Sequence, residues 1–147
     1  MSTDCKYCKP GIAPPGMLWV AQHAAGTVLL VEDANHPGRC VVASSAHVRE
    51  LFELSYGQRD AFMALVSAVA KTVAVAARAD KINVGFYGDL SNHLHAHVVP
   101  KWQAGHGWGD AFLLQPRAPL HLANGPFDGW PATEIAAQLR DALSSAP

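Results

Sequence analysis

Three histidines alternate with apolar residues in the segment that reads His-Leu-His-Ala-His-Val-Val-Pro at positions 93 to 100. Successive side chains of an extended strand point to opposite faces, so His93, His95 and His97 share one face. Imidazoles titrate near neutral pH, bind metals and act as nucleophiles or proton carriers. A solvated edge strand would normally expose Lys, Thr or Glu instead. The pattern therefore favours one wall of a catalytic or metal-binding site over a polar edge.

Cysteine supplies the second candidate chemistry. Cys5 and Cys8 form a Cys-x-x-Cys pair near the start, and Cys40 lies inside an apolar segment. Such a pair can be redox-active, can hold structural zinc or can have neither role, and the spacing alone does not decide. A zinc ion would need two more ligands. Cys40 is expected to be a core residue.

Composition narrows the class of protein. A chain of 147 residues that is 50% hydrophobic suits a single domain over 1–147. A net charge of −1 gives no electrostatic case for nucleic acid or for an acidic membrane surface, so a small substrate is expected. The apolar stretch 61–79 is interrupted by polar residues and indicates a packed helix, not a membrane span. The first residues lack the apolar core of a signal peptide, so we expect a cytoplasmic protein.

Around these residues the sequence predicts an α+β fold: an antiparallel sheet of about five strands with one long packed helix and a short C-terminal helix. Ser55 and Gln58 form a capping box that starts the long helix, which should end near Asp80. The stretch 101–130 is rich in Gly, Pro and Trp and has little periodicity. The expected strands are 17–22, 27–33, 39–44, 81–87 and 94–100, and the final helix is 133–143.

The run from His93 to Val99 fits the His-φ-His-φ-His-φ-φ signature, in which φ is apolar, of the histidine triad (HIT) family. The chain resembles a bacterial-type branch of that family with a Cys-x-x-Cys arm and an extended C-terminus. The resemblance covers a core of about residues 5–100 and leaves 101–147 as an extension. Its other landmarks are Cys5-x-x-Cys8, Pro37-Gly38-Arg39-Cys40-Val41-Val42 before His47, Leu51-Phe52-Glu53-Leu54, Lys81-Ile82-Asn83, Gly88-Asp89, Pro100-Lys101 and Trp108-Gly109.

The resemblance implies a nucleotide hydrolase that cleaves at the α-phosphate of nucleoside phosphoramidates or dinucleoside polyphosphates. His95 would attack phosphorus and form a nucleotidyl-histidine intermediate, and His97 would bind phosphate oxygens or assist the leaving group. Adenine is the expected base and a homodimer the expected assembly. The alternatives are a nucleotidyltransferase, or a zinc-stabilised nucleotide-binding or regulatory protein with little turnover.

The resemblance also implies nucleotide contacts outside the triad. Asn83 on the preceding strand, with Asp89 and Ser91 in the loop before the triad, is expected to contact the phosphate side. Many family members have Gly-Gln-Ser in this loop, whereas this chain has Gly88-Asp89-Leu90. An ionised Asp donates no hydrogen bond, so Asp89 is equally compatible with a turn role. Glu32 or Asp33 falls near the family's acidic ribose contact.

Some HIT relatives carry structural zinc, and the positions that match their ligands are Cys5, Cys8, His47 and His93. This Cys₂His₂ set suits tetrahedral zinc and would tie the N-terminal arm to the strand that carries His95. We favour zinc over an arm without metal. The other four histidines are expected to be surface or loop residues without ligand roles: His23, His36, His106 and His121.

Overall fold

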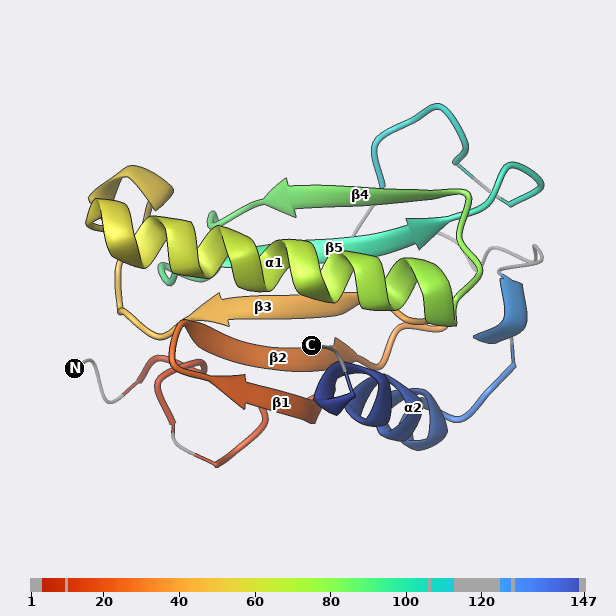
Figure 1. Cartoon of the computed structure of the whole chain (residues 1–147), viewed down its shortest axis with the longest axis horizontal. Helices are drawn as coiled ribbons and strands as arrows, with labels where there is room; N and C mark the ends of the chain where they lie inside the picture. The colour runs from red at the N-terminus through yellow and green to blue at the C-terminus, as the bar shows by residue number, and fades with distance from the viewer. Residues whose placement is uncertain (1–3, 10, 106, 113–124, 128, 146–147) are drawn as a thin grey trace.

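The computed structural model describes residues 4–9, 11–105, 107–112, 125–127 and 129–145. A five-stranded antiparallel sheet forms the centre of the molecule, in the spatial order β1-β2-β3-β5-β4 (Figure 1). The predicted α+β class is confirmed. The strands are β1 (Met17–His23), β2 (Gly26–Val31), β3 (Cys40–Ser44), β4 (Lys81–Phe86) and β5 (His95–Lys101), and two 3₁₀ turns lie at Leu51–Glu53 (η1) and Gly125–Phe127 (η2).

The long helix α1 (Tyr56–Ala76) begins at the predicted capping box. The Ser55 side chain accepts a hydrogen bond from the Gln58 amide, and the Gln58 side chain accepts one from the Ser55 amide. The helix ends at Ala76, short of the predicted end near Asp80. Arg78 adopts a positive φ of 46°, which a right-handed helix cannot continue.

The short helix α2 (Ala132–Ser144) packs against β1 and against α1. Its buried residues Ile135, Ala136 and Leu139 join the same hydrophobic core as the buried face of α1. Both helices therefore cover one face of the sheet, and Figure 1 shows them in front of the strands. Among the described residues, none of the helices has the length and apolar character needed to span a bilayer.

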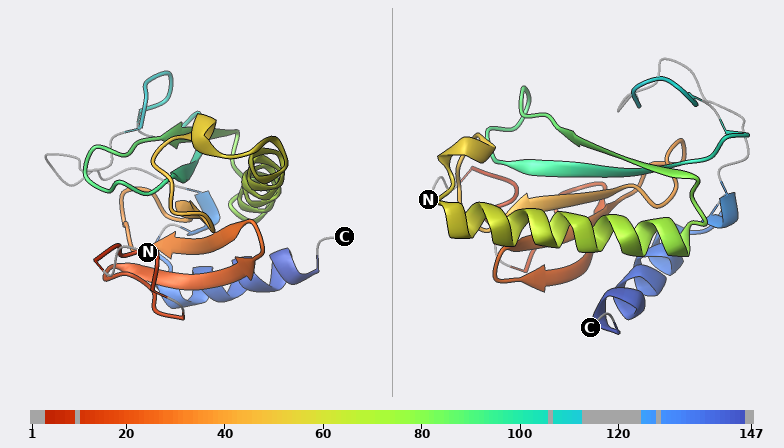
Figure 2. Two further views of the ribbon diagram at one scale, coloured as in Figure 1. Left: turned by 90° about the vertical axis from the view of Figure 1, so that its left-hand side faces the viewer. Right: turned by 45° about the horizontal axis from the view of Figure 1, so that its top comes forward.

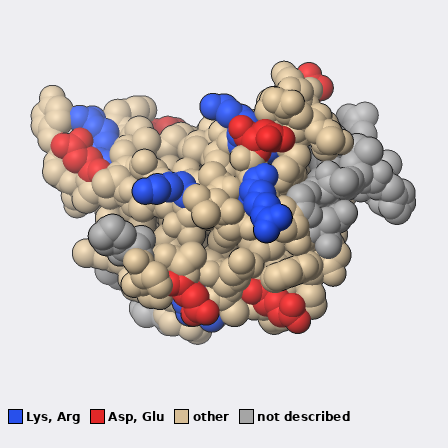
Figure 3. Space-filling model, turned by 45° about the vertical axis from the view of Figure 1, so that its right-hand side comes forward, with Lys and Arg blue, Asp and Glu red and all other residues tan. Residues whose placement is uncertain are grey.

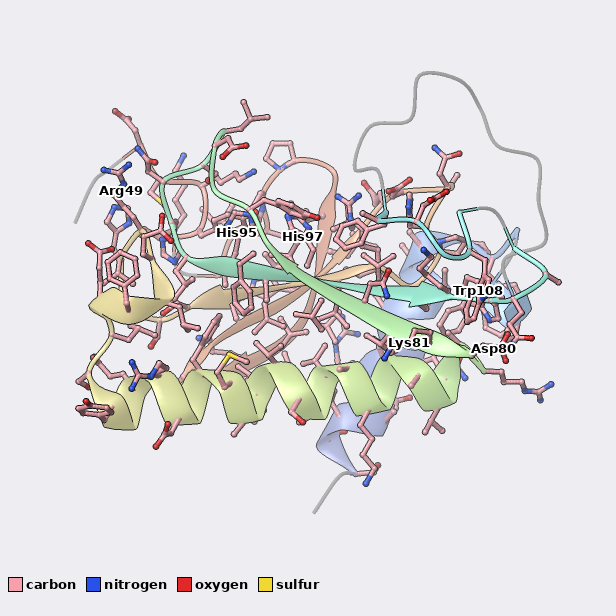
Figure 4. All side chains as sticks on the ribbon, turned by 90° about the horizontal axis from the view of Figure 1, so that it is seen from above. Arg49, Asp80, Lys81, His95, His97 and Trp108 are labelled. Atoms are coloured by element: carbon pink, nitrogen blue, oxygen red, sulfur yellow. The ribbon has the colours of Figure 1, made fainter. Side chains whose placement is uncertain are left out.

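The opposite face of the sheet carries the histidines. Figure 4 shows His95 and His97 on the side of the sheet away from α1. In the left view of Figure 2, α1 and the loop after β5 lie on opposite sides of the sheet. Every residue of β5 is buried, because the helices cover one of its faces and other segments cover the histidine face. The triad therefore lies in an enclosed site and not on a solvated edge.

Candidate active site and metal centre

The four predicted metal ligands come together although they are far apart in the sequence. Their ligand atoms all lie within 4.8 Å of one another. Nδ1 of His93 lies 3.3 Å from Cys5 Sγ and 3.1 Å from His47 Nδ1, and Cys8 Sγ lies 3.1 Å from His47 Nδ1. Ligands of tetrahedral zinc stand about 3.3–3.8 Å apart, given Zn–N near 2.0–2.1 Å and Zn–S near 2.3 Å. Cys5, Cys8, His47 and His93 thus form a possible zinc site.

The proton arrangement of His93 also suits a metal. Its Nε2 lies 2.8 Å from the carbonyl oxygen of Ser44, so this nitrogen is the donor and Nδ1 keeps a free lone pair. Burial lowers the pKa of His93, outweighing the hydrogen bond to Ser44. A neutral imidazole whose far nitrogen donates to a carbonyl is the usual form of a histidine ligand. Ser44 is the last residue of β3, so the sheet itself orients this ligand.

His95 is held in the form that a nucleophile requires. Its Nδ1 lies 2.6 Å from the carbonyl oxygen of His93, which can only accept, so Nδ1 carries the proton and Nε2 is left unprotonated. Burial lowers the pKa of His95 and favours the neutral imidazole. Because the same residue, His93, offers its ring to the metal and its carbonyl to His95, the two sites share one piece of backbone.

His97 lies beside His95, with ring centroids 5.0 Å apart and the rings nearly perpendicular. Its Nδ1 is buried and has no hydrogen-bond partner within the described part of the chain. Burial lowers the pKa of His97 to about 3, with smaller contributions from His95, Arg39 and Lys6. His97 is therefore a neutral imidazole near neutral pH, which favours binding of phosphate oxygens over supply of a proton.

Aromatic rings cover the histidines. Tyr7, between the two cysteines of the arm, lies 5.0 Å from the His95 ring and 5.5 Å from the His93 ring, measured between centroids. Phe112 and Tyr87 lie 6.3 Å and 5.8 Å from His97. Burial raises the pKa of Tyr7 to about 12, so its hydroxyl stays protonated. This cover explains why the imidazoles are desolvated.

A buried polar cluster adjoins the site where β2 turns into β3. Asp33 lies 2.8 Å from Nη1 of Arg39 and 3.2 Å from Nδ1 of His36. Burial raises the pKa of Asp33, but the His36 hydrogen bond and the Arg39 charge together lower it below its ordinary value. His36 lies in the loop between β2 and β3, as expected of a surface or loop residue, but it is buried there at only 4% exposed. Its ion-pair partner Asp33 lies three residues earlier.

The other predicted nucleotide contacts are less directly linked to the triad. Asn83 lies in β4 opposite Val99, and Gly85 lies opposite His97, so Asn83 shares the histidine face. Asp89 lines a cleft of about 440 Å³ that Arg49 and Glu50 also line. Ser91 takes part in a tight turn through its backbone. No hydrogen bond among the described residues joins Asp89 or Ser91 to His95 or His97.

Three residues of the site were not predicted from the sequence to have a role there: Tyr7, Arg39 and Phe112. Tyr7 could have been suspected, because two metal ligands flank it. Arg39 lies two residues before Val41, which pairs with His97, and the alternation of a strand puts both on the histidine face. Phe112 lies in an aperiodic segment where no local pattern points to it. Of the four histidines expected at surface or loop positions, His106 and His121 lie outside the described residues.

Comparisons with known proteins agree with this fold. A family model described as "HIT domain" matches residues 20–104. A histidine triad protein from Sinorhizobium meliloti has a TM-score of 0.69 at 21% identity, covering 86% of this chain and 90% of that one. A zinc-bound histidine triad family protein from Mycobacterium smegmatis has a TM-score of 0.64 at 21% identity, covering 98% and 96%. Comparison with curated proteins gives no match.

Proposed function

Because the chain belongs to the histidine triad (HIT) family, whose domain model matches residues 20–104, we propose that it is a nucleotide hydrolase acting at the α-phosphate. The substrates are nucleoside phosphoramidates or dinucleoside polyphosphates, with adenine as the base. The observation that carries the proposal is the hydrogen bond from His95 Nδ1 to the His93 carbonyl, which frees Nε2 for attack.

The reaction has two steps. Nε2 of His95 attacks the α-phosphorus and forms a phosphorus–nitrogen bond, while the bond to the leaving group breaks. A phosphate departs with its electron pair, and an amine departs with its electron pair and a proton taken up from solvent. Water then attacks the same phosphorus, breaks the bond to Nε2 and releases the nucleoside monophosphate and a proton. Neutral His97 donates a hydrogen bond to a phosphate oxygen in both steps. Asn83, Asp89 and Ser91 are proposed to bind the phosphate side of the nucleotide.

Zinc, when bound, supplies a structural link and no chemistry at phosphorus. Cys5 and Cys8 hold the arm, and His47 and His93 hold the sheet. The arm carries Tyr7, whose ring lies against His95. We therefore propose that the metal ligands keep both the nucleophile and its aromatic cover in place. Thiolate ligands must stay reduced, which supports the proposal that the protein works in the cytoplasm.

The assembly is proposed to be a homodimer formed through β4. This strand is an edge of the sheet, and its Val84 and Phe86 are 43% and 41% exposed. An unpaired edge with exposed apolar side chains is a surface on which a second copy can pair.

Turnover of adenosine 5′-phosphoramidate and of diadenosine polyphosphates by the purified protein tests the proposed function. His95→Ala should lower turnover by several orders of magnitude, because it removes the covalent nucleophile, and AMP should still bind. His23→Ala, a change at an exposed histidine at the end of β1, is the matched control. Activity of His95→Ala within about tenfold of the parent would mean that His95 is not the nucleophile. Binding without turnover by the parent would favour a nucleotide-binding role.

A further inference from the structure

Arg39 is a buried cation on the histidine face of the sheet. Arg39 is only 7% exposed. In the register of β3 with β5, Cys40 pairs with Val98 and Val41 pairs with His97. Arg39 precedes Val41 by two residues, so both side chains lie on the same face of the sheet, and Arg39 is next to the C-terminal half of β5. The amide of Val31 donates to the Arg39 carbonyl, which extends the ladder to this residue.

The guanidinium of Arg39 is held by a hydrogen bond from one of its nitrogens, and at least one of its other donors is unpaired within the described part of the chain. Nη1 donates to Asp33 over 2.8 Å. Nε is buried and has no hydrogen-bond partner among the residues that the structure describes. An arginine side chain has five N–H donors in one plane. A hydrogen bond to one carboxylate oxygen orients the guanidinium and leaves other donors able to bind an anion. Leaving a buried donor of a cation unpaired is unfavourable unless a ligand takes it.

A phosphate is bound most strongly where a positive charge lies beside the histidines. His97 is neutral near neutral pH, because burial lowers its pKa to about 3. The positive charge of Arg39 acts on His97 and on Tyr7, and Tyr7 in turn lies against His95. Lys6 is the other cation that acts on His97, but its side chain is exposed. Lys101 is a second buried cation on this face, but its Nζ donates to the carbonyls of Gly107 and Asp110. Arg39 is thus the desolvated cation that keeps an unpaired donor within the described part of the chain.

We propose that Arg39, oriented by Asp33 beside His97, binds the phosphoryl group that His95 attacks. This assignment rests on the proposed function, since it places a nucleotide phosphate on the histidine face. The guanidinium pairs with non-bridging phosphate oxygens and stabilises the negative charge on them, and Asp33 is a positioning residue for it. Nucleotides should therefore bind much more tightly than the corresponding nucleosides.

Binding of AMP and of adenosine, measured by calorimetry on the full chain, tests this assignment. Arg39→Gln should weaken AMP binding by about tenfold or more and change adenosine binding by less than about threefold, because only AMP carries the phosphate. Arg39→Lys keeps the charge but loses the fork, so its loss for AMP should be intermediate. Arg59→Gln is the charge-matched control. Arg59 stacks on Tyr56 at the exposed start of α1 and should leave both affinities unchanged.

A second measurement removes dependence on the folding of Arg39→Gln. In ¹⁵N-labelled parent protein, the Nε–H resonance of Arg39, assigned with Arg39→Lys, should shift when AMP is added and stay in place with adenosine. Equal losses of AMP and adenosine affinity in Arg39→Gln, or an Nε–H signal that AMP does not move, would overturn the role of Arg39 alone. A parent that binds AMP but hydrolyses no substrate would overturn the hydrolase and leave Arg39 as a phosphate ligand. A parent that binds no AMP would overturn both.

Discussion

His95 and His97 lie two residues apart on β5, yet their surroundings give them different roles. His95 has a carbonyl partner that fixes which nitrogen carries the proton. His97 has no such partner at Nδ1 among the described residues, and its pKa of about 3 reflects burial first. At this scale the site is a set of neutral imidazoles beside a buried arginine. Its chemistry depends on desolvation as much as on residue type.

Burial of neutral His97 should make the protein sensitive to acid. Its pKa of about 3 in the folded protein lies below the ordinary 6.5, so the unfolded chain binds more protons between these values. The stability it contributes is complete above about pH 6.5 and is lost as the pH falls toward 3. Between about pH 6.5 and pH 5 the loss from this one group is at most about 2 kcal/mol.

Denaturant unfolding near pH 7.5 and near pH 5 measures this effect. The free energy of unfolding of His97→Gln should fall less between the two pH values than that of the parent. Acid release of a metal would affect both proteins alike and so cancels in the comparison. His23→Gln, at an exposed position, should behave as the parent. An equal fall in the parent and in His97→Gln would show that His97 is not a source of acid sensitivity.

At the scale of elements, two connections position the site: the Cys-x-x-Cys arm and the turn from β2 to β3. The arm lies against β5 through Tyr7 and the metal ligands. The turn carries the ion pair of Asp33 with Arg39. On the other side of the triad, Nζ of Lys101 donates to the carbonyls of Gly107 and Asp110. This contact holds the loop that leads to Phe112, which covers His97.

The stability of the Cys-x-x-Cys arm should depend on a bound metal ion. Protein purified without chelator should hold about one zinc per chain, and Cys8→Ser should lose the metal and melt at a lower temperature, because metal binding at a structural site contributes folding free energy. Metal analysis and thermal unfolding with and without chelator test this expectation. Cys40→Ala, which alters a buried cysteine outside the cluster, should keep its zinc. Reduced parent protein without zinc, whose melting a chelator leaves unchanged, would remove the four ligands from the site.

The conformation of the turn from β2 to β3 should depend on a glycine at position 38. Its φ is +87°, and a Cβ built there would lie 2.9 Å from Cδ2 of Phe127. Gly38→Ala should therefore lower the free energy of unfolding by about 2 kcal/mol or more, from backbone strain and overlap combined. Gly57→Ala is the matched control, because a Cβ at Gly57 in α1 meets nothing within 4 Å. That change should raise stability by about 0.5–1 kcal/mol. Denaturant titration that finds Gly38→Ala as stable as the parent would contradict the expectation.

At the scale of the whole molecule, the two edges of the sheet differ. At the β1 edge, Arg140 of α2 donates to the carbonyl of Trp19, whereas in the described part of the chain β4 has β5 as its one strand partner. On the face shown in Figure 3, basic and acidic side chains lie in small groups of both signs and do not form one basic patch. The surface features of this face therefore agree with a small-molecule substrate, and the β4 edge is the proposed site for a second copy.

Light scattering with size-exclusion chromatography should show a dimer. Val84→Lys should shift it to monomer, because a charged side chain on an edge strand opposes pairing. Leu90→Lys, in a loop and 95% exposed in the parent, should leave the dimer intact. If Val84→Lys remains a dimer, or if Leu90→Lys dissociates to the same extent as Val84→Lys, the dimer contact is not at β4.

Much of the fold and part of the site followed from the sequence by itself, because they depend on local rules. The alternation of His93, His95 and His97 sets their common face, and the capping box of Ser55 and Gln58 sets the start of α1. The four metal ligands followed from a family resemblance and not from spacing. Boundaries were less exact where a competing interaction ended an element. The strand expected over 27–33 ends at Val31, because Asp33 leaves it to bind Arg39 and His36.

Only the tertiary structure decided the proton positions and charges of the site. The tautomer of His93 depends on the carbonyl of Ser44, 49 residues away in the sequence. The low pKa of His97 depends on burial, and its neighbours Phe112 and Tyr87 come from a loop and from the end of β4. The pairing of Asp33 with Arg39 requires the turn that brings β2 beside β3. Such contacts are not periodic, and they form only when distant segments close over one another and exclude water.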